Sequence, residues 1–125
     1  MKTQSVLFAL GSMLLAVQDV SATCYGSGDK WPNKEQARRF VIDACNNNGG
    51  MFTGTYWKGQ TKAMCPKSNG MGLLFEVQNL TPNEGNSDLN NNECTIRLEN
   101  EINGCDRGGQ STVSGWRFRA DPGAC

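Results

Sequence analysis

The stretch Met71–Gln78 reads MGLLFEVQ, and its side-chain pattern predicts a β-strand. Successive side chains of a strand point to opposite faces, so one face of this segment would carry Leu73, Phe75 and Val77. The other face would carry Leu74, Glu76 and Gln78. The first of these faces is entirely apolar, which indicates a strand with one buried side.

Two strand-like segments precede this stretch. Met51–Trp57 (MFTGTYW) is rich in aromatic and β-branched residues, and Gln60–Cys65 follows it after the dipeptide Lys58-Gly59. Two such runs joined by a two-residue turn predict an antiparallel hairpin. The residues between this hairpin and the strand at 71, Pro66–Gly70, are expected to form a loop.

A helix is expected before these strands, over Asn33–Cys45. Asn33 is a suitable N-cap, and Gln36 stands where the reciprocal partner of a capping box belongs. The apolar residues repeat at helical spacing and form one stripe, which consists of Ala37, Phe40, Val41, Ala44 and Cys45. Asn46–Gly50 (NNNGG) supplies residues that tolerate the left-handed conformation found at helix ends.

After the strand at 71 come a polar, turn-rich segment over 79–92 and a segment of ambiguous pattern, Glu93–Asn103. Ile96 and Leu98 alternate with Arg97 as in a strand, whereas a helical stripe comprises Cys94, Leu98, Ile102 and Cys105. We favour the helix, because the asparagines before it offer N-caps and Asn103-Gly104 offers a stop.

The last strand is expected over Thr112–Ala120, with Gly115 marking a bulge. Its apolar face would carry Trp116, Phe118 and Ala120, and its other face Arg117 and Arg119. The element order predicts an α+β fold: a small disulfide-stabilised domain with two helices packed on a mostly antiparallel sheet of about four to five strands. An extended piece over Thr23–Ser27 would precede these elements.

All six cysteines lie in this domain: Cys24, Cys45, Cys65, Cys94, Cys105 and Cys125. An even number in a small chain, without CxxC spacing and without histidine, predicts three disulfides and an oxidising compartment rather than a metal site. Cys94 and Cys105 cannot pair if they share one helix, because eleven residues span about 16 Å and a disulfide needs Cα atoms within about 7 Å. The other pairings stay open.

The first residues predict a secretory signal peptide. Lys2 is followed by the apolar run Val6–Val17, and the small residues of Val20–Ala22 suit cleavage after Ala22. Twelve residues span about 18 Å, too little for a hydrocarbon core of roughly 30 Å. We therefore expect a removed leader over 1–22, one domain over 23–125, secretion, and no membrane span.

Charge and residue content exclude several functions. With 12 basic and 12 acidic residues the chain lacks the basic surface of a nucleic-acid-binding protein. Without histidine it has no Ser-His-Asp triad. Glu93, Arg97 and Glu101 are spaced as surface ion pairs on one helix face, which is not the carboxylate pair of a glycosidase. Counted from Asn86, the asparagine-rich segment 86–97 has Asn91 at position 6 and Arg97 at position 12, where a calcium loop needs glycine and glutamate. We expect no enzyme activity, metal or cofactor.

The aromatic residues are the most useful functional hint. If Phe52, Gly54 and Tyr56 face the core, Trp57 faces solvent at the hairpin tip, beside polar groups that suit sugar hydroxyls. Trp31 and Tyr25 form a second candidate pair, and Trp116 is assigned to the core. The candidate ligand-binding residues are Tyr56, Trp57, Lys58, Gln60, Trp31, Arg117 and Arg119. Asn79 opens the sequon Asn79-Leu80-Thr81 and is a candidate N-glycosylation site.

The chain also resembles small secreted cysteine-rich proteins of fungi, in particular the glycan-binding protein Y3-like family. The resemblance spans residues 23–125 and rests on cysteine placement and on two end motifs, Cys24-Tyr25-Gly26-Ser27-Gly28 and Gly115–Gly123 (GWRFRADPG). It implies helices on an antiparallel sheet, secretion, a glycan or cell-wall partner, and a homodimer. It assigns no individual sugar-contacting residue.

Three functions follow as alternatives. A lectin-like module would present an exposed aromatic in a shallow polar site. A secreted effector or killer-toxin-like protein would act on a host or competitor protein or on a membrane without competition from sugars. A small carbohydrate-active hydrolase would need two carboxylates across a cleft. We favour the first, with the second close to it and the third well behind.

Overall fold

The computed structural model describes residues 23–125, and the predicted signal peptide lies outside this range. The described chain contains two helices and eight strands. In chain order they are β1 (Thr23–Cys24), α1 (Lys34–Ala44), β2 (Gly54–Tyr56), β3 (Thr61–Met64), β4 (Lys67–Ser68), β5 (Met71–Asn79), β6 (Ser87–Leu89), α2 (Asn91–Asn103), β7 (Gly109–Val113) and β8 (Trp116–Pro122).

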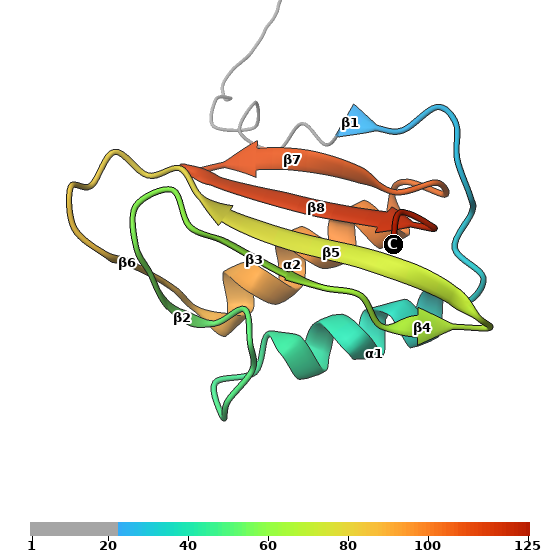
Figure 1. Cartoon of the computed structure of the whole chain (residues 1–125), viewed down its shortest axis with the longest axis horizontal. Helices are drawn as coiled ribbons and strands as arrows, with labels where there is room; N and C mark the ends of the chain where they lie inside the picture. The colour runs from blue at the N-terminus through green and yellow to red at the C-terminus, as the bar shows by residue number, and fades with distance from the viewer. Residues whose placement is uncertain (1–22) are drawn as a thin grey trace, which may run out of the picture.

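The main sheet has six strands and is antiparallel at every pairing (Figure 1). Its order is β1-β7-β8-β5-β3, and β4 pairs with the first residues of β5. β5 is the stretch that the sequence singles out, and it pairs with β8 from Leu73 opposite Pro122 to Asn79 opposite Trp116. β2 and β6 form a separate two-stranded sheet.

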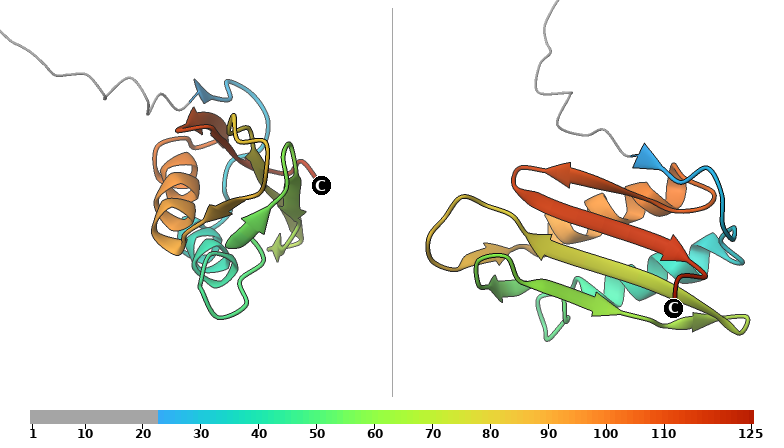
Figure 2. Two further views of the ribbon diagram at one scale, coloured as in Figure 1. Left: turned by 90° about the vertical axis from the view of Figure 1, so that its left-hand side faces the viewer. Right: turned by 45° about the horizontal axis from the view of Figure 1, so that its top comes forward.

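Both helices cover the same face of the main sheet and leave the other face open (Figure 2). The side chain of Asn33 caps α1 by accepting from the Gln36 N–H, and Asn90 caps α2 through the Glu93 N–H. The α+β architecture and both helices are confirmed. The structure has more strands than the four to five expected. Among residues 23–125 no helix combines the length and apolarity needed to cross a membrane.

The core lies between the helices and the covered face of the sheet. The alternating residues of β5 and β8 that were expected to be buried are buried, namely Leu73, Phe75, Val77, Trp116, Phe118 and Ala120. Ala37 and Val41 of α1 and Leu98 and Ile102 of α2 meet them from the other side. The open face therefore carries the alternate residues of β5 and β8, which are polar apart from Gly72 and Leu74.

Three disulfides join Cys24 to Cys105, Cys45 to Cys94, and Cys65 to Cys125. Cys94 and Cys105 have different partners, as the helix geometry required. Each bridge joins segments at least 49 residues apart, so each restricts a large loop of the unfolded chain. Three disulfides in so small a domain are typical of extracellular proteins.

The predicted hairpin between 51–57 and 60–65 is wrong. β2 pairs with β6, in a segment where only turns were expected, and β3 pairs with β5. The turn Trp57–Gln60 has a positive φ at Gly59, its third residue, and not at Lys58. This is type II geometry, which splays two strands rather than joining them as a hairpin.

The hairpins lie at two turns where a loop and a bulge were expected. Asn69 and Gly70 have φ of 53° and 81°, and Ser114 and Gly115 have φ of 53° and 84°. Two consecutive positive φ values define the type I′ turn that suits the twist of a hairpin. Asn69-Gly70 therefore joins β4 to β5 instead of lying in a loop. Gly115 closes the turn between β7 and β8 and is not a bulge.

Ser114 adopts a left-handed conformation that asparagine tolerates better than serine. Ser114→Asn is therefore expected to stabilise the domain by about 0.5–1 kcal/mol, since it gives this turn the sequence already present at Asn69-Gly70. Urea unfolding of both proteins measures the difference as a shift in midpoint at constant slope. Ser27→Asn, at an exposed bend outside the left-handed region, is the matched control. An unchanged or lower midpoint for Ser114→Asn would contradict the assignment.

Candidate functional site

Trp57 is the most exposed large apolar side chain of the described chain, with 64% of its surface accessible. It lies directly after β2, on the turn that leads into β3. The preceding Tyr56 points into the core and is fully buried. Because side chains alternate along an extended chain, Trp57 points away from the core. The expected exposure of Trp57 is confirmed.

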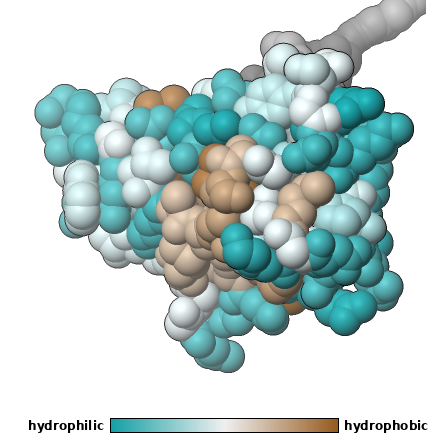
Figure 3. Space-filling model, turned by 45° about the vertical axis from the view of Figure 1, so that its right-hand side comes forward, coloured by the Kyte–Doolittle hydropathy of each residue, from teal (hydrophilic) through white to brown (hydrophobic). Residues whose placement is uncertain are grey.

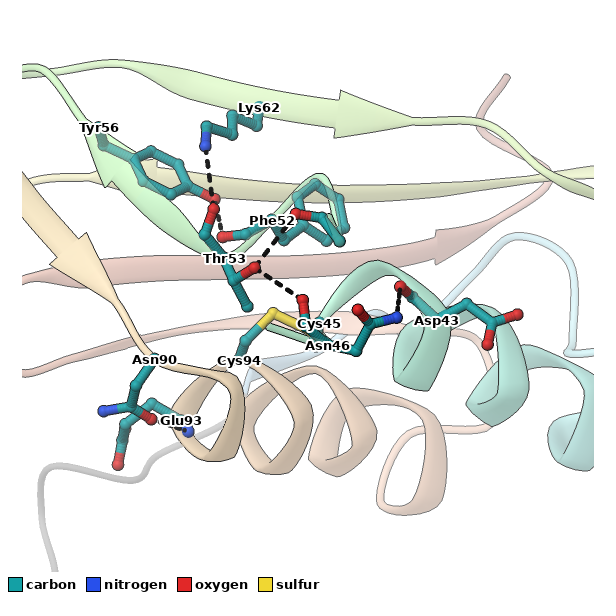
Figure 4. Close-up of a disulfide and its surroundings, with 11 residues drawn as sticks. Asp43, Cys45, Asn46, Phe52, Thr53, Tyr56, Lys62, Asn90, Glu93 and Cys94 are labelled. Atoms are coloured by element: carbon teal, nitrogen blue, oxygen red, sulfur yellow. Dashed lines mark hydrogen bonds between the residues drawn. A yellow bond between two sulfur atoms is a disulfide. The ribbon is translucent and has the colours of Figure 1, made fainter. Parts of the chain in front are cut away.

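Tyr56 anchors the strand that presents this indole. Its hydroxyl donates to the carbonyl oxygen of Phe52 at 2.7 Å, and its ring meets the Trp116 ring edge-on with centroids 4.9 Å apart. The Lys62 ammonium lies 4.0 Å from the centre of the same ring (Figure 4). Burial raises the pKa of Tyr56 and lowers the pKa of Lys62. The Tyr56 phenol therefore stays neutral and keeps its hydrogen at the Phe52 carbonyl.

The segment before β2 is held to both helices. The Cys45–Cys94 disulfide links the end of α1 to the first turn of α2, as Figure 4 shows. The Thr53 hydroxyl lies 2.9 Å from the carbonyl oxygen of Asn46 and 3.1 Å from that of Gly50. The Lys62 ammonium reaches the Thr53 carbonyl oxygen at 3.4 Å. β2 therefore enters the turn from a fixed position.

Asn79 holds the turn itself. Its side-chain nitrogen lies 3.1 Å from the carbonyl oxygen of Trp57 and 3.4 Å from that of Tyr56. Its side-chain oxygen accepts from the N–H and the hydroxyl of Thr81. The backbone of Asn79 adds two bonds, accepting from the Gly59 N–H and donating to the Gln60 carbonyl. The residue that presents the exposed indole is thus tied to the last residue of β5.

This arrangement corrects the expectation of an accessible glycosylation site at Asn79. The side chain is 1% exposed, and the nitrogen that would carry a glycan faces two carbonyl oxygens. The folded domain has no room for a sugar there. Sequence reasoning missed the positioning role of Asn79, since the only local signal was the Asn-Leu-Thr sequon.

The polar side chains near Trp57 include one acidic and one basic group, whose charges cancel. Lys58 and Glu84 form an ion pair at 3.1 Å, with side chains 51% and 93% exposed. The side-chain oxygen of Gln60 accepts from the Trp57 N–H at 2.9 Å, which fixes the turn and leaves the amide nitrogen of Gln60 outside that bond. Trp57, Lys58 and Gln60 are therefore brought together, as the sequence predicted.

Arg117 and Arg119 lie on the open sheet face and are held in ion pairs. Arg117 reaches Glu76 at 3.2 Å and the Gln78 side chain at 3.0 Å. Arg119 reaches Glu76 at 3.4 Å and Asp121 at 2.9 Å. The hydrogen bond to Asp121 is the main cause that raises the pKa of Arg119. Gln78 in turn donates to the Gly59 carbonyl at 3.3 Å, so Gln78 links Arg117 to the turn.

Two other predicted ligand residues lie in the core. Trp31 is 8% exposed, its ring stacks on Phe75 at 5.8 Å, and its indole nitrogen donates to the Cys105 carbonyl at 2.8 Å. Tyr56 is buried as described above. The structure corrects the inclusion of Trp31 and Tyr56 among the candidate ligand-binding residues, because neither ring presents a free face. Of the second aromatic pair, only Tyr25 remains partly exposed.

Glu101 was expected on the solvated face of the second helix and is instead fully buried. One carboxylate oxygen accepts from the Ser111 hydroxyl at 2.7 Å, and the other has no hydrogen-bond partner. Burial raises the pKa of Glu101, against the opposing effect of the Ser111 hydrogen bond. Only the Glu93–Arg97 part of the predicted ion-pair row is present. Glu101 faces β7 from inside the domain, so it is not accessible to a ligand, and its ionisation affects the stability of the fold.

The surface of the described domain is shallow. Residues 23–125 enclose no pocket, and they contain no group of three or more acidic, cysteine or histidine residues that could hold a metal ion. Figure 3 shows apolar residues gathered on one side of the molecule within a mostly hydrophilic surface. Partly exposed apolar residues of β3 and β5 are Met64, Met71 and Leu74. None of them is aromatic, so the exposed ring of Trp57 remains the more specific feature.

Comparison with models of known protein families finds no match, and a search of curated proteins finds no relative. The residues and their geometry therefore carry the functional proposal.

Proposed function

We propose that this protein is a secreted, non-enzymatic, glycan-binding protein whose contact site is the Trp57 turn. The observation that carries the proposal is an indole 64% exposed on a turn fixed by Asn79, Gly59 and Gln60. Burying an aromatic ring is strongly favourable. Here the hydrogen bonds fix the backbone of the turn and so keep the indole exposed to solvent, where it can contact a ligand. Secretion is supported by the disulfides and by the leader pattern of the sequence.

The chemistry around Trp57 suits a carbohydrate. An indole face packs against the C–H groups of a sugar ring, and neighbouring polar groups bond to its hydroxyls. Lys58 supplies donors, Glu84 supplies acceptors, and their charges cancel. A rigid turn also lowers the entropy lost on binding.

A protein target is the second candidate, since Leu80 follows Asn79 and is 46% exposed. Apolar surface near a tryptophan is also typical of protein interfaces. This alternative corresponds to a secreted effector or toxin-like protein. It differs from the first in that free sugars would not compete for the surface.

A glycan array probed with the oxidised domain of residues 23–125 tests the proposal. We expect saturable binding to defined glycans and a loss of about tenfold or more in affinity for Trp57→Ala, equivalent to about 1.4 kcal/mol. The matched control is Ile96→Ala, which removes another exposed apolar side chain, on α2. Both variants should keep the wild-type circular dichroism, because neither residue is in the core.

The outcomes separate the alternatives. Binding that Trp57→Ala abolishes and Ile96→Ala preserves supports a glycan site at the turn. Binding that survives in Trp57→Ala would overturn the site. If the folded protein binds no glycan, the proposal fails, and a protein target that depends on Trp57 and Leu80 becomes the better hypothesis.

A further inference from the structure

The open face of the main sheet carries a continuous row of polar side chains, which we call the polar ladder. It consists of Gln78 and Glu76 on β5 and of Arg117, Arg119 and Asp121 on β8. Both helices lie on the opposite face, so within residues 23–125 no helix covers this row (Figure 2). Each of the five residues is partly exposed.

The polar ladder is continuous with the Trp57 turn. Arg117 donates to the Gln78 side chain at 3.0 Å, and the Gln78 amide donates to the Gly59 carbonyl at 3.3 Å. The turn and the first step of the ladder are therefore joined by direct hydrogen bonds. A ligand that covers Trp57 can extend onto the sheet along this side.

A second aromatic residue lies toward the other end of the ladder. Tyr25 follows β1, its N–H donates to the Gly108 carbonyl, and its hydroxyl lies 3.5 Å from the Gln110 side chain. Gln110 is the cross-strand partner of Arg119. Tyr25 is partly exposed, so an aromatic residue lies toward the end of the polar row opposite the Trp57 turn.

The polar ladder is also neutral and rigid. Arg117 and Arg119 are balanced by Glu76 and Asp121, at distances between 2.9 and 3.4 Å. At the turn, Lys58 is balanced by Glu84. An acidic or basic ligand would gain little from such a surface, whereas uncharged hydroxyl groups can bond to the remaining donors and acceptors.

The shape of the surface favours a long ligand. From the level of Arg117 to that of Asp121 the strand advances about 14 Å, at about 3.4 Å per residue. The Trp57 turn adds to this at one end. Residues 23–125 form no pocket that would enclose a single terminal sugar. A flat row of this length can instead contact several units of one extended chain.

We propose that the ligand is an internal segment of a neutral, linear polysaccharide that lies along the open face from Trp57 across the polar ladder to Tyr25. This inference rests on the proposed glycan-binding function and specifies its ligand class. It predicts that affinity grows with chain length until the chain reaches Tyr25. It also predicts little dependence on salt, since screening acts on unbalanced charge.

The test is calorimetric titration of the oxidised domain with three neutral series, the cello-, chito- and laminari-oligosaccharides, from disaccharide to octasaccharide. At least one series should show a gain in affinity of about tenfold or more from the shortest to the longest member, the equivalent of one further ring contact. Tyr25→Ala should remove most of this gain and leave the affinity for the shortest member unchanged. Trp57→Ala should weaken binding at every length.

The control variant is again Ile96→Ala, on the helical side of the domain, which should leave the length dependence intact. A length series that is flat, binding that is tighter for polygalacturonate than for any neutral chain, or no binding to the three series overturns the inference. If the glycan array is positive in any of these cases, the proposed function stands and only the ligand class fails. A negative array together with negative titrations removes both.

Discussion

Asn79→Asp is expected to destabilise the domain by about 3–5 kcal/mol, because it buries a charge without a counter-ion. Stabilities of small domains are about 5–15 kcal/mol, so such a loss is a large part of the total. In the native protein the side-chain nitrogen of Asn79 faces the carbonyl oxygens of Tyr56 and Trp57. In the variant a carboxylate oxygen would face the same two oxygens, which repel it.

The effect should reach the candidate site as well as the fold. With the bond to the Trp57 carbonyl lost, the turn has one tie fewer, and glycan binding should weaken along with stability. Burial without a counter-ion should raise the pKa of the new carboxyl in the folded variant. The loss of stability should therefore shrink as pH falls from that raised pKa toward about 4, the ordinary value in the unfolded chain. Urea unfolding followed by circular dichroism measures the free energy of unfolding.

Asn86→Asp provides the control, because Asn86 is exposed in the neighbouring loop. The same chemical change there should alter stability by less than about 0.5 kcal/mol. If the two variants differ by no more than this amount, the assigned role of Asn79 is wrong.

Strand faces and helix caps could be predicted from the sequence because each depends on neighbouring residues. The alternation in Leu73, Phe75 and Val77 reports the buried side of β5 without knowledge of its partners. Asn33 and Asn90 act through N–H groups three residues away. Strand pairing depends on backbone angles at turns, and at 57–60 the order Lys-Gly, with glycine second, gives a turn that separates the strands. Asn69-Gly70 is a dipeptide typical of type I′ hairpin turns, so this hairpin was predictable from the sequence.

The candidate site was predictable only in part, for the same reason. The alternation of Tyr56 and Trp57 predicts which ring is buried and which is exposed. No local pattern shows that Asn79, more than twenty residues later, hydrogen-bonds to this turn. Trp31 likewise precedes a helix without a periodic pattern of its own, and its burial depends on Phe75 and Cys105.

Glu101 leads to the second large effect, a fall in stability as pH rises. Burial raises the pKa of this carboxyl in the folded state, while the unfolded chain keeps the ordinary value. Between those two pKa values the folded state binds more protons than the unfolded state. The free energy of unfolding therefore falls with rising pH in this window, with a limiting slope of about 1.4 kcal/mol per pH unit for one proton.

Glu101→Gln should remove this slope and leave the domain more stable than the wild type at pH values above the window. The amide oxygen of glutamine can accept the Ser111 hydroxyl as the carboxylate does, and no charge is buried. Within residues 23–125 no lysine or arginine forms an ion pair with Glu101, so the substitution breaks no buried pair. Urea unfolding at a series of pH values compares the two proteins.

Glu99→Gln is the matched control, on the same helix but outside the core. Its stability should follow the wild-type pH profile, because this variant keeps the buried carboxyl of Glu101. A Glu101→Gln profile parallel to that of the wild type would show that the buried carboxyl is not the source of the slope. A variant less stable than the wild type at pH values above the window would show that the ionised carboxylate is favourably held in the folded domain, which would contradict the prediction.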